Sequence, residues 1–445
     1  MAQKGISLSM TSARDAAVKL LLKIEKDNAY STLSVAEESE KTAFADGREQ
    51  ALFAALVYGV LERRLALDYN LAQYLSAPLK KLHPKTLCIL RVGALQILFM
   101  DKIPARAAVS EAVAQAKRMG VGFTAGLINA VLRKAADRGP VWPPEGDREA
   151  YLTVRYSCPG WLLRHFTECY GDEKAEKILA AFEGRKPLFL RLNPLRGVNV
   201  AARLEEEGLT VTPTDLDGCV SVAGTGDIAS LDAFRKGLFH VQDRSSQLCC
   251  KLLGAKPGET VVDCCAAPGG KTFTVAETMN DKGVVYANDV YEHKIRLIEE
   301  GAARLGLTSV RTVLGDAADL PDKLPPADRV LCDAPCSGLG VIGRKPEIRY
   351  KDPASLAGLP ELQYRLLRRC AELVKPGGTL LYSTCTLNPA ENEAVCDRFL
   401  GETTGFSLSE DPFYRSLCGN ARYKTFFPKP DGGDGFFVAL FRRKP

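Results

Sequence analysis

Residues 261–272 read VVDCCAAPGGKT and combine a strand end, a glycine turn and a lysine in one short stretch. An apolar run ends in Asp263, and small residues then lead to Lys271 and to a segment with helical character. This order is typical of a nucleotide-type cofactor site, because glycine lets the backbone approach a ligand and a helix start offers free N–H groups. A plain β–α turn is the simpler alternative. A phosphate-binding P-loop is excluded, since its first glycine would fall on Cys265.

Three aspartates stand at or just beyond the ends of the strands expected after this turn. Asp289 suits a carboxylate that binds the two ribose hydroxyls of an adenosine, Asp316 could hold the adenine amino group, and Asp333 ends the fourth strand. One such aspartate could be only a helix cap, but three in order after a glycine turn favour a binding site. The NAD fingerprint GxGxxG is absent, so S-adenosylmethionine fits the pattern better.

Two cysteines directly follow the fourth and fifth expected strands, Cys336 in DAPCSG and Cys385 in YSTCT. A lone cysteine at a strand end is usually structural, but two beside a methyl donor indicate nucleophilic catalysis. The C5 carbon of a pyrimidine is too unreactive to be methylated directly. A thiolate that adds to C6 makes C5 enamine-like, and a base must later remove the C5 proton before the thiol leaves. The residues alone do not decide which of the two cysteines is the nucleophile.

The elements that must position these residues alternate from Glu259 onward, which predicts a doubly wound α/β domain. A final strand over Phe437–Arg443 is expected to be antiparallel. The predicted strands are Thr260–Asp263, Val284–Asn288, Val310–Leu314, Arg329–Asp333 and Thr379–Ser383, and the predicted helices are Phe273–Met279, Glu292–Leu305, Leu359–Leu373 and Pro389–Leu400.

The chain before this domain divides into a helical part and a small mixed part. Apolar residues at helical spacing predict helices over Ala13–Ile24, Gln50–Leu61, Leu65–Leu75, Thr86–Met100, Val109–Arg118 and Ala125–Ala135. The Pro- and Gly-rich segment 138–149 is the best candidate for a linker. Residues 150–240 are expected to hold a helix over Trp161–Phe182, a strand over Pro187–Asn193 and further short strands, and Asp243 is a plausible N-cap. We therefore expect three domains, over residues 1–140, 150–240 and 241–445.

Composition limits the remaining choices. The 445 residues, 46% hydrophobic and 25% charged, fit a soluble protein of two to three domains, and no apolar run is long enough to span a membrane. The start lacks a signal peptide, so the cytoplasm is the expected location. The 14 cysteines form no CxxC pair and the four histidines do not flank them, so no metal site is expected. Positive charge exceeds negative charge in residues 1–150, which permits nucleic-acid binding.

These segments resemble known families. LVYGVLERR (residues 56–64), ILRVGALQILFMDKIPARAAVSEAV (89–113) and INAVLRK (128–134) resemble the helical NusB-type RNA-binding domain. DCCAAPGGKT, NDV, GDAADL, DAPCSGLGVIGRKPEIRY, YSTCTLNPAENE and DGFFVALFRR resemble the RNA cytosine-5 methyltransferases, and VQDRSSQ and LRLN look like segments of the same family. With the preceding helical domain, the resemblance narrows to the bacterial RsmB (Sun/Fmu) branch, which methylates a cytosine of 16S ribosomal RNA.

The resemblance implies a fold, a cofactor and residue roles. The fold is an all-α NusB-like domain, a small α+β domain and a Rossmann-like α/β methyltransferase domain. Cys385 is implied to be the nucleophile and Cys336 to assist release of the methylated RNA, while Asp333 holds the cytosine amino edge and Lys271 orients Asp333. The residues implied to bind S-adenosylmethionine are Cys265, Ala266, Ala267, Pro268, Gly269, Gly270, Lys271, Asp289, Asp316 and Asp333. Cys264 departs from the apolar residue usual there, which is expected to change packing only.

The sequence leaves the RNA target open. Ribosomal RNA of the small subunit is the expected partner of a monomeric enzyme, and a tRNA or another rRNA cytosine is the alternative within the same chemistry. A non-catalytic RNA-binding or ribosome-assembly factor is the alternative from another class. The cations Arg344, Lys345 and Arg349 follow the Cys336 motif and are expected to meet phosphates near the pocket. A target base in a helix would have to leave the stack to reach the cysteines.

Overall fold

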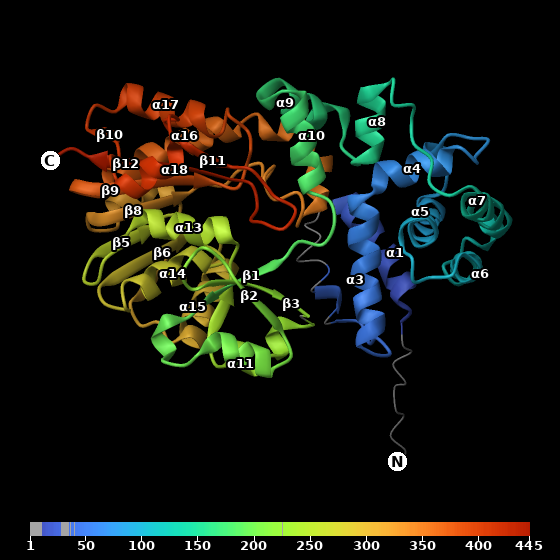
Figure 1. Ribbon diagram of the computed structural model, residues 1–445, viewed down its shortest axis with the longest axis horizontal. Helices are drawn as coiled ribbons and strands as arrows, with labels where there is room; N and C mark the ends of the chain where they lie inside the picture. The colour runs from blue at the N-terminus through green and yellow to red at the C-terminus, as the bar shows by residue number, and fades with distance from the viewer. Residues whose placement is uncertain (1–10, 28–34, 36, 40, 225) are drawn as a thin grey trace, which may run out of the picture. The chain divides into compact units, whose positions relative to one another are not determined.

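The computed structural model describes residues 11–27, 35, 37–39, 41–224 and 226–445 (Figure 1). Its contacts divide the chain into two compact units. The first holds residues 1–183 together with 344–351, and the second holds residues 184–343 and 352–445. A short stretch from within the second unit's sequence thus belongs structurally to the first. No helix in the described part of the chain is both long enough and apolar enough to cross a membrane.

The first unit is entirely helical in its described residues, as the apolar spacing predicts. Its main helices pack around one apolar core that includes Leu21, Phe53, Leu90 and Leu132. Helix α5 begins at Pro84 rather than after it, because a proline in the first helical turn loses no hydrogen bond. The helices are α1 (Ala13–Asp27), α3 (Gly47–Glu62), α4 (Arg64–Ala72), α5 (Pro84–Phe99), α6 (Ala105–Arg118), α7 (Ala125–Arg138), α8 (Arg148–Arg155), α9 (Gly160–Tyr170) and α10 (Asp172–Ala181).

The single helix expected over residues 161–182 is two helices, so this prediction is wrong in one respect. Gly171 separates α9 from α10 and has φ +79°, a left-handed conformation that ends α9 and that glycine adopts without steric cost. Apolar spacing continues across the break, with Phe166 and Leu179 both buried. The periodicity therefore concealed the interruption, and the glycine was the signal for it.

The second unit begins with a four-stranded antiparallel sheet in the order β2-β3-β1-β4. Its strands are β1 (Leu188–Leu192), β2 (Thr210–Pro213), β3 (Cys219–Ala223) and β4 (Phe239–Val241), and its helices are α11 (Val200–Glu206) and α12 (Asp232–Arg235). At the end of β1, Asn193 donates hydrogen bonds to the carbonyl oxygens of Gly237 and Leu305 at 3.0 and 3.1 Å. Leu305 is the last residue of helix α15 (Glu292–Leu305), which packs on the larger sheet, so Asn193 joins the two sheets of this unit.

The larger sheet of the second unit confirms the predicted doubly wound α/β fold. Its order is β10-β12-β9-β8-β5-β6-β7, with β11 paired to β12. Strands β5 to β9 run parallel, whereas β12 pairs antiparallel with β9, as expected for the final strand. The strands are β5 (Thr260–Asp263), β6 (Val284–Asp289), β7 (Val310–Leu314), β8 (Ala327–Asp333), β9 (Val374–Thr384), β10 (Phe406–Leu408), β11 (Lys424–Phe426) and β12 (Phe436–Arg443).

Helices cover both faces of this sheet (Figure 1). Neighbouring residues of β5 show why: Val261 packs on the face that carries α13, α14, α15 and α18, while Val262 packs on the face that carries α16 and α17. Side chains alternate along a strand, so two buried faces require the continuous apolar runs seen in the sequence. The helices are α13 (Arg244–Leu253), α14 (Gly270–Thr278), α15 (Glu292–Leu305), α16 (Leu359–Glu372), α17 (Glu393–Glu402) and α18 (Pro412–Cys418). Asp243 is the N-cap of α13, as predicted.

The segment 344–351 packs into the first unit through Arg349, which is only 4% exposed. Its Nη1 donates to the carbonyl oxygens of Glu62 at 2.8 Å and Tyr156 at 3.0 Å, and Tyr350 donates its hydroxyl to Leu61 O at 2.9 Å. Leu61 and Glu62 end α3, where carbonyl groups lack helical partners and a positive charge is favourable. The guanidinium therefore caps a helix, and the expectation that Arg349 meets RNA phosphates is wrong.

We predict that Arg349→Met destabilises the first unit by about 3 kcal/mol, because two partly buried carbonyl groups lose a charged donor that is itself buried. Both tryptophans of the chain, Trp142 and Trp161, lie in this unit, so tryptophan fluorescence during urea unfolding reports on it selectively. Arg148→Met is the matched control, since Arg148 forms an exposed ion pair with Glu176 and should cost less than about 1 kcal/mol. Equal midpoints for the two variants would contradict the capping role.

Candidate active site

The predicted site residues gather where the parallel strands end. Strands β5, β6, β7, β8 and β9 share one direction, so their carboxyl ends form one edge of the sheet. Ligands of open α/β sheets bind in the crevice outside this edge. Asp263 ends β5, Asp289 ends β6, Asp333 ends β8, and Cys385 follows β9 directly. The topology thus brings to one edge residues that lie more than 100 positions apart in the sequence.

The glycine turn after β5 leads directly into helix α14. Gly269 has φ +108°, and a Cβ at this position would lie 2.3 Å from the ring of Phe273, so only glycine fits. Helix α14 starts at Gly270, and no side chain caps it. Its first N–H groups therefore remain available to a polar group of a ligand. Cys265, Ala266, Ala267 and Pro268 form the turn between β5 and this helix start.

Lys271 and Asp333 form an ion pair across the site. Lys271 Nζ donates to Asp333 Oδ2 at 2.6 Å, and Ser383 Oγ donates to Asp333 Oδ1 at 2.7 Å. Burial by itself would lower the pKa of the Lys271 ammonium, but the negative charge of Asp333 outweighs it and the net pKa lies above the ordinary value. Lys271 is therefore a permanent cation that holds a carboxylate in one orientation, and not a base.

Asp263 is a second carboxylate in this neighbourhood, and the sequence reasoning assigned it no role. It is 2% exposed, and Thr272 Oγ1 donates to its Oδ2 at 2.7 Å. Burial raises the pKa of Asp263 to about 7, with a smaller contribution from the negative charge of Asp333. Its position at the end of β5 was visible in the sequence, but its complete burial depends on the packing of distant segments.

The raised pKa of Asp263 predicts a pH effect on the stability of the ligand-free protein. Because the folded-state pKa of about 7 exceeds the ordinary 3.8, folding favours the protonated acid. This contribution is fully present below about pH 4 and is lost as the pH rises through about 7, which amounts to roughly 4 kcal/mol. Asp263→Asn mimics the neutral acid, so its melting temperature in calorimetry should fall less than that of the wild type between pH 4 and pH 8. Parallel curves for the two proteins would exclude this linkage.

Cys336 and Cys385 face each other with their sulfur atoms 3.3 Å apart. Both side chains are partly exposed, so a substrate can reach them. The hydrogen bond with the Cys385 sulfur raises the pKa of Cys336 above its ordinary value, and burial adds to this shift. The two thiols therefore share one hydrogen bond, and whichever sulfur is ionised can accept it from the other.

A buried polar frame holds the two cysteine loops together. Ser337 and Thr386 hydroxyl oxygens lie 2.6 Å apart, and the N–H of Gly340 donates to the carbonyl oxygen of Cys385 at 3.0 Å. The carboxylate of Glu391, 0% exposed, accepts from the N–H of Ser337 at 2.9 Å and from Gln363 Nε2 at 2.8 Å. Sequence reasoning missed Glu391, although it lies inside the quoted motif YSTCTLNPAENE.

The other predicted acids have local partners as well. Asp289, 7% exposed, accepts the N–H of Tyr291 at 3.1 Å and lies 3.6 Å from Lys294 Nζ. Asp316 is exposed and accepts the N–H of Ala318 at 2.9 Å as an N-cap. The N–H of Tyr291 uses Asp289 Oδ1 while Oδ2 faces Lys294, and the N-cap bond of Asp316 uses its Oδ1. In the described part of the chain, no group of three or more His, Cys, Asp or Glu side chains is placed to hold a metal ion.

Comparison with known proteins agrees with this geometry. Residues 250–442 match the family model described as 16S rRNA methyltransferase RsmB/F, residues 11–137 match the NusB family, and residues 158–229 match the ferredoxin-like domain of RsmF/B-like methyltransferases. A Bacillus subtilis protein named probable ribosomal RNA small subunit methyltransferase B is 38% identical over 98% of this chain and 100% of its own length. The chain belongs to this methyltransferase B family.

Further relatives extend over nearly the whole chain. A Synechocystis protein of the same name is 37% identical over 98% of this chain and 100% of its own. The crystal structure of PH0851 has a TM-score of 0.82 at 28% identity and covers 98% of this chain and 100% of that one. A Pyrococcus horikoshii methyltransferase homologue has a TM-score of 0.59 at 28% identity over 67% of this chain and 99% of its own. This family member is thus a methyltransferase, and S-adenosylmethionine is its cofactor.

Proposed function

We propose that this methyltransferase B family member forms 5-methylcytosine in 16S ribosomal RNA through a covalent bond between Cys385 and C6 of the target base. The observation that carries the proposal is the pair of sulfur atoms 3.3 Å apart beside the Lys271–Asp333 ion pair. The names of the relatives support ribosomal RNA of the small subunit as the substrate.

The cofactor site fits an adenosine with a small charged tail. The turn Cys265–Lys271 offers backbone groups at the start of α14, and Asp289 and Asp316 line the same edge. Val290 and Leu314, 55% and 53% exposed, stand at the ends of β6 and β7 beside these acids. Large apolar side chains left exposed beside polar groups suit the faces of an adenine ring. Bound S-adenosylmethionine supplies the methyl group.

The residues of the chain divide the rest of the chemistry. Asp333, held by Lys271 and Ser383, accepts a hydrogen bond from the cytosine amino group and keeps the ring in one orientation. The thiolate of Cys385 adds to C6, and the electron pair of the C5–C6 double bond then makes C5 the nucleophile for the methyl group. A base must next take the C5 proton, after which the double bond re-forms and the Cys385 sulfur leaves.

Cys336 is the base or proton donor best placed for release. Its hydrogen bond with Cys385 is the largest cause of its raised pKa, and this cause disappears once the Cys385 sulfur is bonded to carbon. The Cys336 sulfur, 3.3 Å from that of Cys385, then lies beside the carbons to which Cys385 is bonded. Its neighbour Ser337, held by Glu391 and Thr386, keeps the loop in place.

We predict that Cys336→Ala accumulates a covalent protein–RNA complex, because addition to C6 still occurs while release slows. The complex is measured as a slow-migrating band on denaturing gels after incubation with 16S RNA and S-adenosylmethionine. Cys336→Ala/Cys385→Ala is the control and should give no band. A single variant that forms no complex and turns over normally would refute the release role.

The identity of the RNA is tested separately. Bisulfite sequencing of total RNA from cells with and without this protein should show one protected 16S cytosine that depends on it. A dependent site in tRNA would favour the alternative substrate, and no dependent site would favour a binding factor without catalysis. The intact Cys385, Cys336, Asp333 and Lys271 argue against such a factor.

The domain limits and the cellular setting form part of the same proposal. We place an RNA-binding helical domain at residues 1–140, a small α+β region at 150–240 and the catalytic domain at 241–445. The protein is proposed to act as a monomer in the cytoplasm, where ribosomal RNA is available and its 14 cysteines stay reduced.

A further inference from the structure

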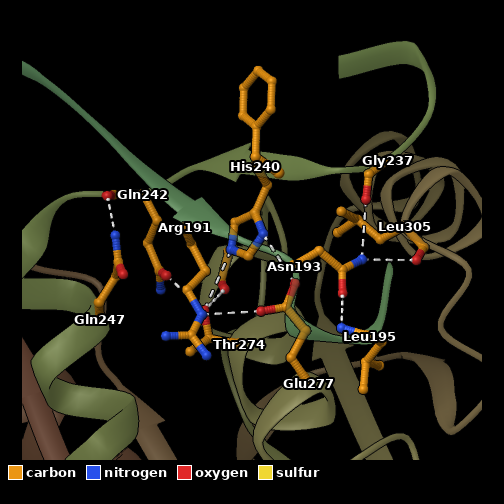
Figure 2. Close-up of polar contacts among 12 residues, drawn as sticks. Arg191, Asn193, Leu195, Gly237, His240, Gln242, Gln247, Thr274, Glu277 and Leu305 are labelled. Atoms are coloured by element: carbon orange, nitrogen blue, oxygen red, sulfur yellow. Dashed lines mark hydrogen bonds and ion pairs between the residues drawn. The ribbon is translucent and has the colours of Figure 1, made fainter. Parts of the chain in front are cut away.

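A buried polar cluster joins helix α14 to the four-stranded sheet, outside the cysteine and cofactor residues (Figure 2). Thr274 and Glu277 extend from α14, Arg191 from β1 and His240 from β4, and Gln242 follows β4 directly. All but Arg191 are at most 5% exposed, and the Arg191 side chain is 14% exposed. The proposed chemistry uses none of these side chains, so their burial needs another explanation.

Glu277 is the charged centre of the cluster. Its Oε2 accepts a hydrogen bond from Arg191 Nε at 3.1 Å, and its Oε1 lies 3.5 Å from His240 Nδ1 (Figure 2). Arg191 also donates from Nη1 to the carbonyl oxygen of Asp217 at 2.9 Å. Burying a carboxylate costs free energy unless a charged partner forms a well-oriented hydrogen bond with it. The ion pair with Arg191 therefore fixes the position of this part of α14 against β1 and β4.

Thr274 and Gln242 hold the first turns of the same helix. Thr274 Oγ1 lies 2.6 Å from Gln242 Oε1 and 3.3 Å from His240 Nε2. A Cβ at Gly270 would lie 3.7 Å from Gln242 Cγ, so this side chain packs directly on the helix start. Gly270, Thr274 and Glu277 are spaced as one helical face. One face of α14 thus rests on polar groups of the small sheet.

The neighbouring residues of α14 reach the proposed catalytic groups. Lys271 pairs with Asp333, and Thr272 binds Asp263. No side chain caps α14, whose nine residues are held by lateral contacts instead. A short rigid helix cannot shift at Glu277 without shifting Lys271. We infer that the Glu277–Arg191 pair positions Lys271 for methyl transfer, an inference that rests on the role proposed above for Lys271.

The test removes both charges together, so that no unpaired charge stays buried. Arg191→Met/Glu277→Gln should lower kcat about 10- to 100-fold, as expected for a displaced catalytic group, while the KM for RNA stays within about twofold. The matched control is Arg329→Met/Glu259→Gln. This pair has distances of 2.8 and 3.1 Å, and its arginine is 13% exposed against 14% for Arg191, although Glu259 is 21% exposed and Glu277 is 0%. It lies in the same unit near the start of β5, away from the carboxyl edge. It should keep the wild-type kcat.

Combination with Lys271→Met separates positioning from general stability. If Glu277 and Arg191 act through Lys271, the triple variant is no slower than Lys271→Met alone. A further loss in the triple variant, or equal losses in the pair variant and its control, would overturn the inference. If the pair variant does not fold, Arg191→Lys, which keeps the charge, should give an intermediate kcat, and a wild-type kcat there would equally overturn it. A wild-type kcat for Lys271→Met would instead refute the proposed site.

Discussion

Cys385→Ala is expected to reduce methyl transfer to RNA by at least about 10⁴-fold, since the proposed reaction has no route to an activated C5 without a nucleophile at C6. Cys336, 3.3 Å away, cannot substitute, because its sulfur occupies the position from which the proposed release step is assisted. S-adenosylmethionine affinity should stay within about twofold of wild type, because the cofactor residues lie on β5, β6, β7 and β8 and their loops and not in the loop after β9 that holds Cys385. Transfer of a tritiated methyl group and calorimetric titration of the cofactor measure the two quantities.

Cys264→Ala is the control for this variant. Cys264 lies next to the cofactor turn, but it is 1% exposed and packs in the apolar core on the face of the sheet that carries α16 and α17. Its replacement should therefore lower the stability of the protein and leave kcat unchanged. RNA with 5-fluorocytidine at the target position gives a second readout, because C5 then carries fluorine in place of the proton that must be removed, so the thiol cannot leave and the adduct is trapped. The trapped complex should form with wild type and with Cys336→Ala but not with Cys385→Ala. A trapped complex in Cys385→Ala would place the nucleophile at Cys336.

The pattern of strand ends explains how much of the site was predictable. Short β-rich runs with two buried faces are recognisable from their apolar residues, and β5 and β7 have the predicted bounds, Thr260–Asp263 and Val310–Leu314. Once the strands are parallel, their ends must share an edge. The convergence of Asp333, Cys336 and Cys385 therefore followed from topology, without knowledge of any side-chain contact.

Other features depend on contacts that no local pattern encodes. Arg349 reads as a cation in a basic loop, yet the structure buries it against the end of α3, nearly 290 positions earlier in the chain. Glu277 and Glu391 read as ordinary surface acids of helical or turn segments, and both are fully buried by partners from other segments. The raised pKa of Asp263 has the same origin, because desolvation is set by every segment that packs on the strand end. Charged residues that are buried by tertiary contacts are thus the main class of residues whose environment the sequence did not predict.

Lys271→Met is expected to lower kcat by about 10³-fold at neutral pH. The proposed role of Asp333 requires an ionised carboxylate that accepts from the cytosine amino group, and the Lys271 ammonium at 2.6 Å provides its compensating charge. With that ammonium replaced by an apolar chain, the Asp333 carboxylate loses its compensating charge and the donor that fixes its orientation. A carboxylate that is no longer fixed holds the amino group less well, so the rate of the chemical step falls while RNA binding changes little.

Lys271→Arg distinguishes this charge effect from a loss of packing. The raised pKa of Lys271 keeps the wild-type cation intact across the neutral range, so the wild-type rate should not depend on its titration there. Lys271→Arg keeps a cation of different shape and should retain part of the rate that Lys271→Met loses. Single-turnover rates of the two variants at neutral pH measure the difference. Equal rates for Lys271→Arg and Lys271→Met would show that the lysine acts through its shape rather than its charge.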